Sequence, residues 1–186
     1  MSKASDVAIP LGYALRPLQP AHPGELDLVV SRSMHTVLDT IPEFGGSEEK
    51  AREHMPNFSR EAMRAMYQRD LERPASHRLV VLHTAEGEIV GHAIYFVRGL
   101  GEASPSGYLF TIYVDPLHRR HGLARALLTD AVRWSEEQGA VRVVAHTHVT
   151  NLGLVQLAER CGFKITERSS APPWPHLTLE RATPTR

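Results

Sequence analysis

The stretch from Tyr108 to Ala124 decides the fold and reads YLFTIYVDPLHRRHGLA. Its first half, up to Val114, is rich in aromatic and β-branched residues, which predicts a strand. The pair Asp115-Pro116 ends that strand, because proline cannot donate a ladder hydrogen bond. A basic turn with Gly122 then leads into apolar residues at helical spacing. The segment therefore predicts a strand, a turn and a helix.

The start of this helix predicts an anion site. The first turn of a helix carries backbone N–H groups without partners, and the helix dipole favours negative charge there. Gly122 has no side chain, so the backbone can approach a phosphate closely, and Ala124 is small for the same reason. Arg119, Arg120 and His121 add donors at the rim. The patterns of a Walker loop and of a dinucleotide fold are absent, and on these residues alone a plain structural connection is the alternative.

Working outward, hydrophobic spacing and turn residues predict one strand, three helices, three strands, a helix, a strand, a helix and two strands. Ser47 and Ser59 are candidate helix caps. The alternation in the second half predicts a mixed sheet with helices packed on it. The predicted elements are Tyr13–Leu18, His22–Thr40, Ser47–Met55, Ser59–Arg73, Arg78–Thr84, Ile89–Arg98, Tyr108–Val114, Gly122–Gln138, Val141–Val149, Asn151–Arg160, Phe163–Glu167 and His176–Glu180.

Length and composition narrow the class of protein. The 186 residues suit one domain, with a core over residues 11–181 and short loose termini. The formal net charge is zero, which argues against a nucleic-acid partner. The single cysteine, Cys161, allows no disulfide within the chain and fits a reducing compartment. No signal peptide or membrane-spanning run is visible, so we expect a cytoplasmic protein with no membrane partner.

The turn at Arg119 resembles the signature motif of the GCN5-related N-acetyltransferase (GNAT) family, in which Arg or Gln is followed after two residues by Gly and, one residue later, by Gly or Ala. Arg119, Gly122 and Ala124 fill these positions. A second block, Asn151 to Phe163 (NLGLVQLAERCGF), resembles the family's Asn-led helix and its terminal Gly-Phe. The resemblance covers residues 78–181 and implies an α/β (mixed α+β) fold. This GNAT-like fold has a central, mostly antiparallel mixed sheet of six to seven strands, splayed at the cofactor site and flanked by helices.

The resemblance implies an N-acetyltransferase that moves acetyl from acetyl-coenzyme A (acetyl-CoA) to a primary amine by direct attack in a ternary complex. One alternative is an acyl-CoA-binding regulatory or sensor domain with little or no turnover. Another is an interaction domain without coenzyme A (CoA). In the family, pantetheine lies along the strand that ends at the motif, backbone amides hold the pyrophosphate, and the motif Asn binds the pantetheine arm or caps its helix. The implied cofactor-binding residues are Ile112, Tyr113, Val114, Arg119, Arg120, His121, Gly122, Leu123, Ala124, Arg125 and Asn151.

Two histidines are candidate catalytic bases. His146 and His148 share one face of a predicted strand, because side chains alternate along it. Some family members carry a catalytic Glu at the position of His146, and histidine titrates near neutral pH. The alternative role is that of a partly buried strand histidine with a local hydrogen bond. Tyr113, which points the opposite way from Ile112, is a weaker candidate.

The acid position departs from the family pattern. Many members place a Tyr seven residues after the motif Asn, where this chain has Ala158. The thiolate then leaves unassisted or takes a proton from water, or another group reaches in, such as Tyr67, Tyr108 or the Cys161 thiol. Weak catalysis is the third possibility. For Cys161, the preferred interpretation is a small packing residue near the end of the helix.

The acceptor side is expected to use the first helices and the loop before the last strand, over residues 41–55 and 169–174. Phe44 and Trp174 are expected to line the pocket or to pack. A group of glutamates in the first stretch predicts either a rim that attracts a cationic amine or a solvated helix face. The acceptor is expected to be a small-molecule amine or a protein amine, the chain a monomer or homodimer, and no metal is expected. The glutamates are Glu43, Glu48, Glu49 and Glu53.

Overall fold

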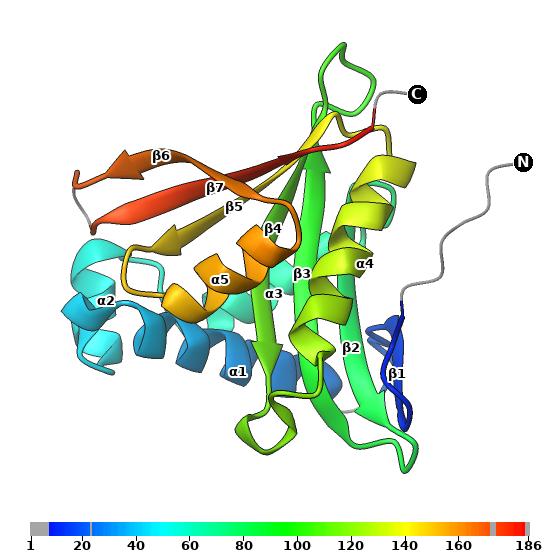
Figure 1. The fold of residues 1–186 in the computed structure, drawn as a ribbon. Helices are drawn as coiled ribbons and strands as arrows, with labels where there is room; N and C mark the ends of the chain where they lie inside the picture. The colour runs from blue at the N-terminus through cyan, green and yellow to red at the C-terminus, as the bar shows by residue number, and fades with distance from the viewer. Residues whose placement is uncertain (1–7, 23, 172–173, 185–186) are drawn as a thin grey trace, which may run out of the picture.

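The computed structural model describes residues 8–22, 24–171 and 174–184, so most of the predicted loose N-terminus, residues 1–7, lies outside the described part. One seven-stranded sheet forms the centre, with strand order β1-β2-β3-β4-β5-β7-β6. Helices α4 and α5 cover one face of the sheet, and α1, α2 and α3 lie on the other (Figure 1). The elements are β1 (Tyr13–Pro17), α1 (Glu25–Thr40), the 3-10 helix η1 (Pro42–Phe44), α2 (Glu48–His54), α3 (Arg60–Leu71), β2 (His77–Thr84), β3 (Ile89–Arg98), β4 (Ser106–Val114), the 3-10 helix η2 (Pro116–His118), α4 (Leu123–Glu137), β5 (Arg142–His148), α5 (Leu152–Arg160), β6 (Lys164–Ser169) and β7 (His176–Ala182).

Side chains at the helix starts explain these boundaries. Ser47 accepts a hydrogen bond from the Lys50 N–H, and Ser59 accepts one from the Ala62 N–H. Each satisfies a backbone donor that the first turn leaves free, so both predicted caps are confirmed. Helix α1 begins later than predicted, at Glu25, because Gly24 precedes it with a left-handed φ of 84°.

The sheet opens between β4 and β5. These two neighbours run parallel, whereas every other neighbouring pair is antiparallel. Their register runs only from Ser106 to Leu109 on β4, opposite Arg142 to Ala145 on β5. Both strands continue past that point, and Figure 1 shows β5 running away from β4. The predicted mixed, mostly antiparallel and splayed sheet is confirmed.

Two apolar clusters hold the layers together, one on each face of the sheet. On the first face, α4 packs against β4 so closely that a Cβ on Gly107 would lie 2.6 Å from the Ser135 Cβ, so only glycine fits there. On the second face, fully buried Val30, Phe44 and Tyr67 pack against the sheet. Val30 and Phe44 each contribute about 1.5–3 kcal/mol by leaving water. No helix within the described ranges is long and apolar enough to cross a membrane.

Candidate functional site

The turn between β4 and α4 presents a row of backbone N–H groups. Arg120 has a φ of 69° and Gly122 a φ of 80°, so one short turn contains two left-handed residues. Among the described residues, the N–H groups from Arg120 to Arg125 donate to no protein acceptor, and intrahelical bonding begins with the Ala126 N–H, which donates to the Gly122 carbonyl. Successive N–H groups in such a turn form an anion-binding concavity, and the dipole of α4 adds to it. The turn therefore has the geometry of an anion site, and its binding of a phosphate stays a prediction.

The side chains of this turn have different surroundings: some pack against the protein and others are exposed. Arg119 folds back, and its Nε donates to the Val114 carbonyl at 3.0 Å, so it braces the turn against the end of β4. Leu123 points into the core with 1% of its surface exposed, which leaves only its N–H for a ligand. Arg120, His121 and Arg125 are exposed and can reach a bound anion. Ala124 is half-buried against the core. The bracing role of Arg119 was not predicted.

The open edge of β4 lies next to this turn. From Phe110 to Val114 the edge that faces β5 has no strand partner. A shift in the β3–β4 register also leaves Phe110 opposite no residue of β3. An unpaired strand edge can accept an added extended segment through main-chain hydrogen bonds. The predicted contact residues Ile112, Tyr113 and Val114 all lie on this edge.

The side chains on this edge point to both faces of the sheet. Ile112 and Val114 pack toward the α4 cluster. Tyr113 faces the other way, as predicted, and its ring stacks on His92 with centroids 5.5 Å apart. The Arg32 guanidinium lies 5.1 Å from the Tyr113 ring centroid. The backbone of Tyr113 can therefore contact a ligand in the gap between β4 and β5, while its ring stays packed against His92.

Asn151 caps helix α5. Its side-chain oxygen accepts from the Leu154 N–H at 3.3 Å, and its amide nitrogen donates to the Thr147 hydroxyl at 3.0 Å. The predicted capping role is confirmed. The amide keeps a second N–H, so its predicted contact with pantetheine stays compatible with the cap and stays a prediction.

His146 has a ring nitrogen that is free to accept a proton. Its Nδ1 lies 3.3 Å from the Thr178 hydroxyl oxygen, and that hydroxyl donates its only proton to Glu167 at 3.2 Å. Nδ1 must therefore carry the proton, which leaves the lone pair on Nε2. Partial burial lowers the pKa of His146 below its ordinary 6.5, and charge repulsion from His176 lowers this pKa further. The imidazole is thus neutral and suited to act as a base at neutral pH.

His148 is held in a different way. It is 5% exposed, and its Nδ1 accepts from the Thr150 N–H at 3.1 Å. Its Nε2 therefore carries the proton and faces a carboxylate oxygen of Glu43 at 3.2 Å. With both nitrogens engaged, His148 has no lone pair for a substrate proton. The prediction of His148 as a base is corrected: it ties η1 to the end of β5.

The predicted acceptor residues lie together but are packed. Phe44 has no exposed surface, and its ring meets Trp174 edge to face with centroids 5.4 Å apart. Phe44 also stacks on His54 at 5.8 Å. The prediction that Phe44 lines an open pocket is corrected, because its surface is used in the core. Trp174 is half-buried against the same cluster.

No phenol stands at the usual acid position. Ala158 is 2% exposed and belongs to the core. Cys161 is half-buried, and burial raises the pKa of its thiol, as expected for a packing cysteine. Tyr67 is fully buried, and burial raises the pKa of its hydroxyl well above the ordinary value. A general acid is therefore not evident among these side chains.

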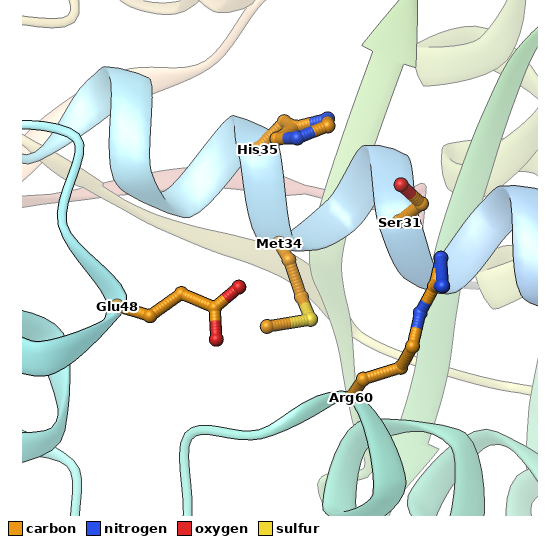
Figure 2. Close-up of a pocket in the computed structure, with 5 residues that line it drawn as sticks. All are labelled: Ser31, Met34, His35, Glu48 and Arg60. Atoms are coloured by element: carbon orange, nitrogen blue, oxygen red, sulfur yellow. The ribbon is translucent and has the colours of Figure 1, made fainter.

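Two cavities lie on the α1–α3 side of the sheet, and neither reaches the turn at Gly122. The smaller, of about 290 Å³, is open to solvent and lies between α1, α2 and the start of α3. Figure 2 shows the Glu48 carboxylate and the Met34 thioether pointing into it, with Arg60 at its other side. The larger, of about 420 Å³, lies between α3 and strands β2, β3 and β4. Its lining includes Asp70, Arg73, His77, Phe96, Arg98 and Phe110. Sequence reasoning did not group these residues, because they come from α3, the loop after it and three strands.

Comparison with known proteins identifies similar acetyltransferases. A family model described as "Acetyltransferase (GNAT) family" matches residues 46–163, more than half of the chain. The aminoglycoside N(6')-acetyltransferase type 1 of Stenotrophomonas maltophilia is 34% identical over 89 residues, which are 45% of this chain and 58% of that protein. The human N-acetyltransferase 8 is 35% identical over 69 residues, which are 37% of this chain and 30% of that protein. This chain thus spans less than two thirds of the length of these curated relatives.

Solved structures share the fold at low identity. A chain of the NatC complex bound to Gag peptide and CoA has a TM-score of 0.69 at 14% identity, covering 94% of this chain and all of the other. Spermidine N-acetyltransferase from Vibrio cholerae, in complex with CoA and spermine, has a TM-score of 0.66 at 18% identity, with 92% and 95% covered. These likenesses concern the arrangement of helices and strands.

Proposed function

This chain belongs to the acetyltransferase (GNAT) family, and from that premise we propose that it transfers acetyl from acetyl-CoA to a primary amine, with residues 11–181 as its single domain. The observation that carries the proposal is the row of unpartnered N–H groups from Arg120 to Arg125 beside the open edge of β4. Such a row fits a diphosphate, and such an edge fits an extended arm with amide groups. Solved relatives of this fold that hold CoA or acetyl-CoA support the choice of cofactor.

The residues of the site fit this cofactor in separate roles. The amides from Arg120 to Arg125 would hold the pyrophosphate, and exposed Arg120, His121 and Arg125 would add charge. Arg119 would keep the turn in place through its bond to Val114. The edge from Ile112 to Val114 would pair with the pantetheine arm, and the free N–H of Asn151 would bind the same arm.

The proposed reaction needs one base from the protein. When bound, acetyl-CoA would supply the thioester carbon that the amine nitrogen attacks, with the coenzyme A thiolate as the leaving group. His146 Nε2 takes the proton that the amine gives up, directly or through water. The contact of Nδ1 with Thr178 fixes the tautomer that this role requires. Because Ala158 replaces the usual phenol, water supplies the proton to the thiolate.

The same absence supports one alternative. A domain that binds acyl-CoA and signals its presence needs the turn and the open edge but no acid. Buried Ala158 and packed Cys161 fit such a regulatory or sensor domain. The two functions differ only in turnover.

Two measurements on the intact chain separate these functions. Acetyl-CoA is expected to raise the melting temperature, and an amine panel is expected to release free thiol faster than the same mixture without amine. Binding without amine-dependent thiol release supports the sensor domain. Absence of any thermal shift at millimolar acetyl-CoA overturns both.

A further inference from the structure

The larger cavity, of about 420 Å³, has an aromatic wall made by His77, Phe96 and Phe110, which come from three strands, and Tyr108 supports this wall from behind Phe96. The rings of His77 and Phe96 stack with centroids 5.4 Å apart, and those of Phe96 and Tyr108 with centroids 5.3 Å apart. Phe110, in the irregular part of β4, adds a ring that is 51% exposed. A large aromatic side chain left this open at a cavity offers an apolar surface for a ligand.

The charges around the cavity leave one cation without a partner. Asp70 binds Arg73 at 2.7 Å and lies 3.6 Å from His77, so its carboxylate is already neutralised. The Arg98 guanidinium lies 5.2 Å from the Phe96 ring centroid and 5.1 Å from that of Tyr108. Within the described ranges Arg98 forms no ion pair. The two rings hold its planar group in place while its N–H groups stay available to a carboxylate.

The cavity adjoins the opening of the sheet. Phe110 directly follows Leu109, the last residue of β4 that pairs with β5, and His146 directly follows Ala145, the last such residue of β5. Val144 pairs with Tyr108 on the face that carries the aromatic wall, and His146, two residues on, points to that face as well. The candidate base, the aromatic wall and Arg98 therefore share one face of the sheet, with Arg98 opposite Ser106 at the start of the paired segment and His146 just past its end.

We propose that this cavity binds the acceptor and that the acceptor is an aromatic α-amino acid, which rests on the proposed function. Arg98 forms a bidentate contact with the carboxylate, and Phe96 and Phe110 contact the aromatic body. The cavity volume lies in the range of about 300–1,000 Å³ that is usual for small-molecule sites. An unpaired guanidinium repels cationic acceptors such as polyamines. The charge of the site thus favours a different acceptor class from the aminoglycoside and spermidine in the names of similar proteins.

Matched amines test the role of the carboxylate. With acetyl-CoA as donor, kcat/KM is measured for L-phenylalanine, for 2-phenylethylamine, which lacks only the carboxylate, and for spermidine. We expect L-phenylalanine to exceed the other two by roughly tenfold or more, as a charge-assisted contact provides. Arg98→Gln should lower kcat/KM for L-phenylalanine by roughly ten- to a hundredfold, mainly through KM, and should not lower kcat/KM for 2-phenylethylamine, which has no carboxylate and is repelled by the guanidinium. Arg60→Gln removes a positive charge from the smaller cavity and should leave kcat/KM unchanged for both amines.

A binding measurement keeps the proposal separate from turnover. Titration calorimetry of L-phenylalanine into the protein loaded with CoA should show binding that Arg98→Gln weakens, while CoA affinity and melting temperature stay unchanged. Arg98-dependent binding without thiol release would support the site and refute acetyl transfer. Equal rates with L-phenylalanine and 2-phenylethylamine, binding that Arg98→Gln leaves intact, or no binding at all would overturn the site. Loss of L-phenylalanine binding in Arg60→Gln, rather than in Arg98→Gln, would place the acceptor in the smaller cavity and would also overturn the proposed site.

Discussion

Substitution of Gly122 by Glu tests the anion site, because helix α4 offers a matched control at its other end. Gly122 and Gly139 have φ values of 80° and 84°. A Cβ at Gly122 would meet only the Pro10 Cγ at 3.7 Å, and one at Gly139 would meet nothing within 4 Å. Any other residue at either position therefore costs stability through the left-handed backbone alone, by about 1–2 kcal/mol. For a chain of this size we expect each variant to melt roughly 2–8 °C lower.

The ligand separates the two variants. We take about 6 Å as the separation between a carboxylate at position 122 and a phosphate bound at the turn. At an effective dielectric constant of about 20, this repulsion is about 3 kcal/mol per unit charge, or roughly a hundredfold in Kd for CoA. The same carboxylate at position 139 lies beyond the far end of a helix that is about 22 Å long, where about 0.1 M salt screens it.

Titration calorimetry with CoA at about 0.1 M salt measures this difference, with urea unfolding of each variant as the check on folding. We expect Gly139→Glu to bind CoA as the unchanged chain does, and Gly122→Glu to bind roughly a hundredfold more weakly. A folded Gly122→Glu variant whose Kd lies within about twofold of the unchanged chain would refute the argument that the turn holds the diphosphate.

Three further predictions concern the base and the stability of the fold. His146→Gln should lower kcat by about a hundredfold or more and leave CoA affinity unchanged. In the unchanged chain, kcat/KM should fall at acid pH with a midpoint below pH 6.5, because the lowered pKa of His146 keeps the base neutral down to that range. The variant should lack this acid limb, and the same limb in both proteins contradicts the assignment. Gly107→Ala should cost about 1–3 kcal/mol in urea unfolding, because its Cβ would lie 2.6 Å from the Ser135 Cβ, and Ser135→Gly should restore part of the loss; an unchanged midpoint speaks against this packing. Hydrogen bonding to Arg16 lowers the pKa of Glu25 from 4.5 to about 2, so Glu25→Gln should cost up to about 3 kcal/mol at pH 7. The stabilisation by Glu25 is fully present above pH 4.5 and is lost as pH falls toward 2. The free energies of unfolding of the two proteins should therefore differ less at pH 2.5 than at pH 7, and an equal difference at both pH values would disprove the assignment.

Much of the fold follows from local sequence signals. Ser47, Ser59 and Asn151 cap their helices because a short polar side chain satisfies a donor of the first turn, whatever lies elsewhere in the chain. The turn at Gly122 is equally local, since a strand, a left-handed glycine and a helix follow one another within a few residues. Physical chemistry that acts over such short separations can be read from the sequence.

The parts that sequence reasoning missed depend on contacts between distant segments. His148 and Glu43 are 105 residues apart, so nothing local showed that the histidine is engaged at both nitrogens. The burial of Phe44 beneath Trp174 depends in the same way on where the last loop lies. Arg98 could not be recognised as an unpaired cation until the sheet placed it over Phe96 and Tyr108.

A crystal structure of the chain with CoA tests the central claim most directly. We expect the diphosphate oxygens within hydrogen-bonding distance of the N–H groups from Arg120 to Arg125, with Arg119 still bound to the Val114 carbonyl and the pantetheine arm along the edge from Ile112 to Val114. CoA bound elsewhere, with those N–H groups closed off by protein side chains, would contradict the account.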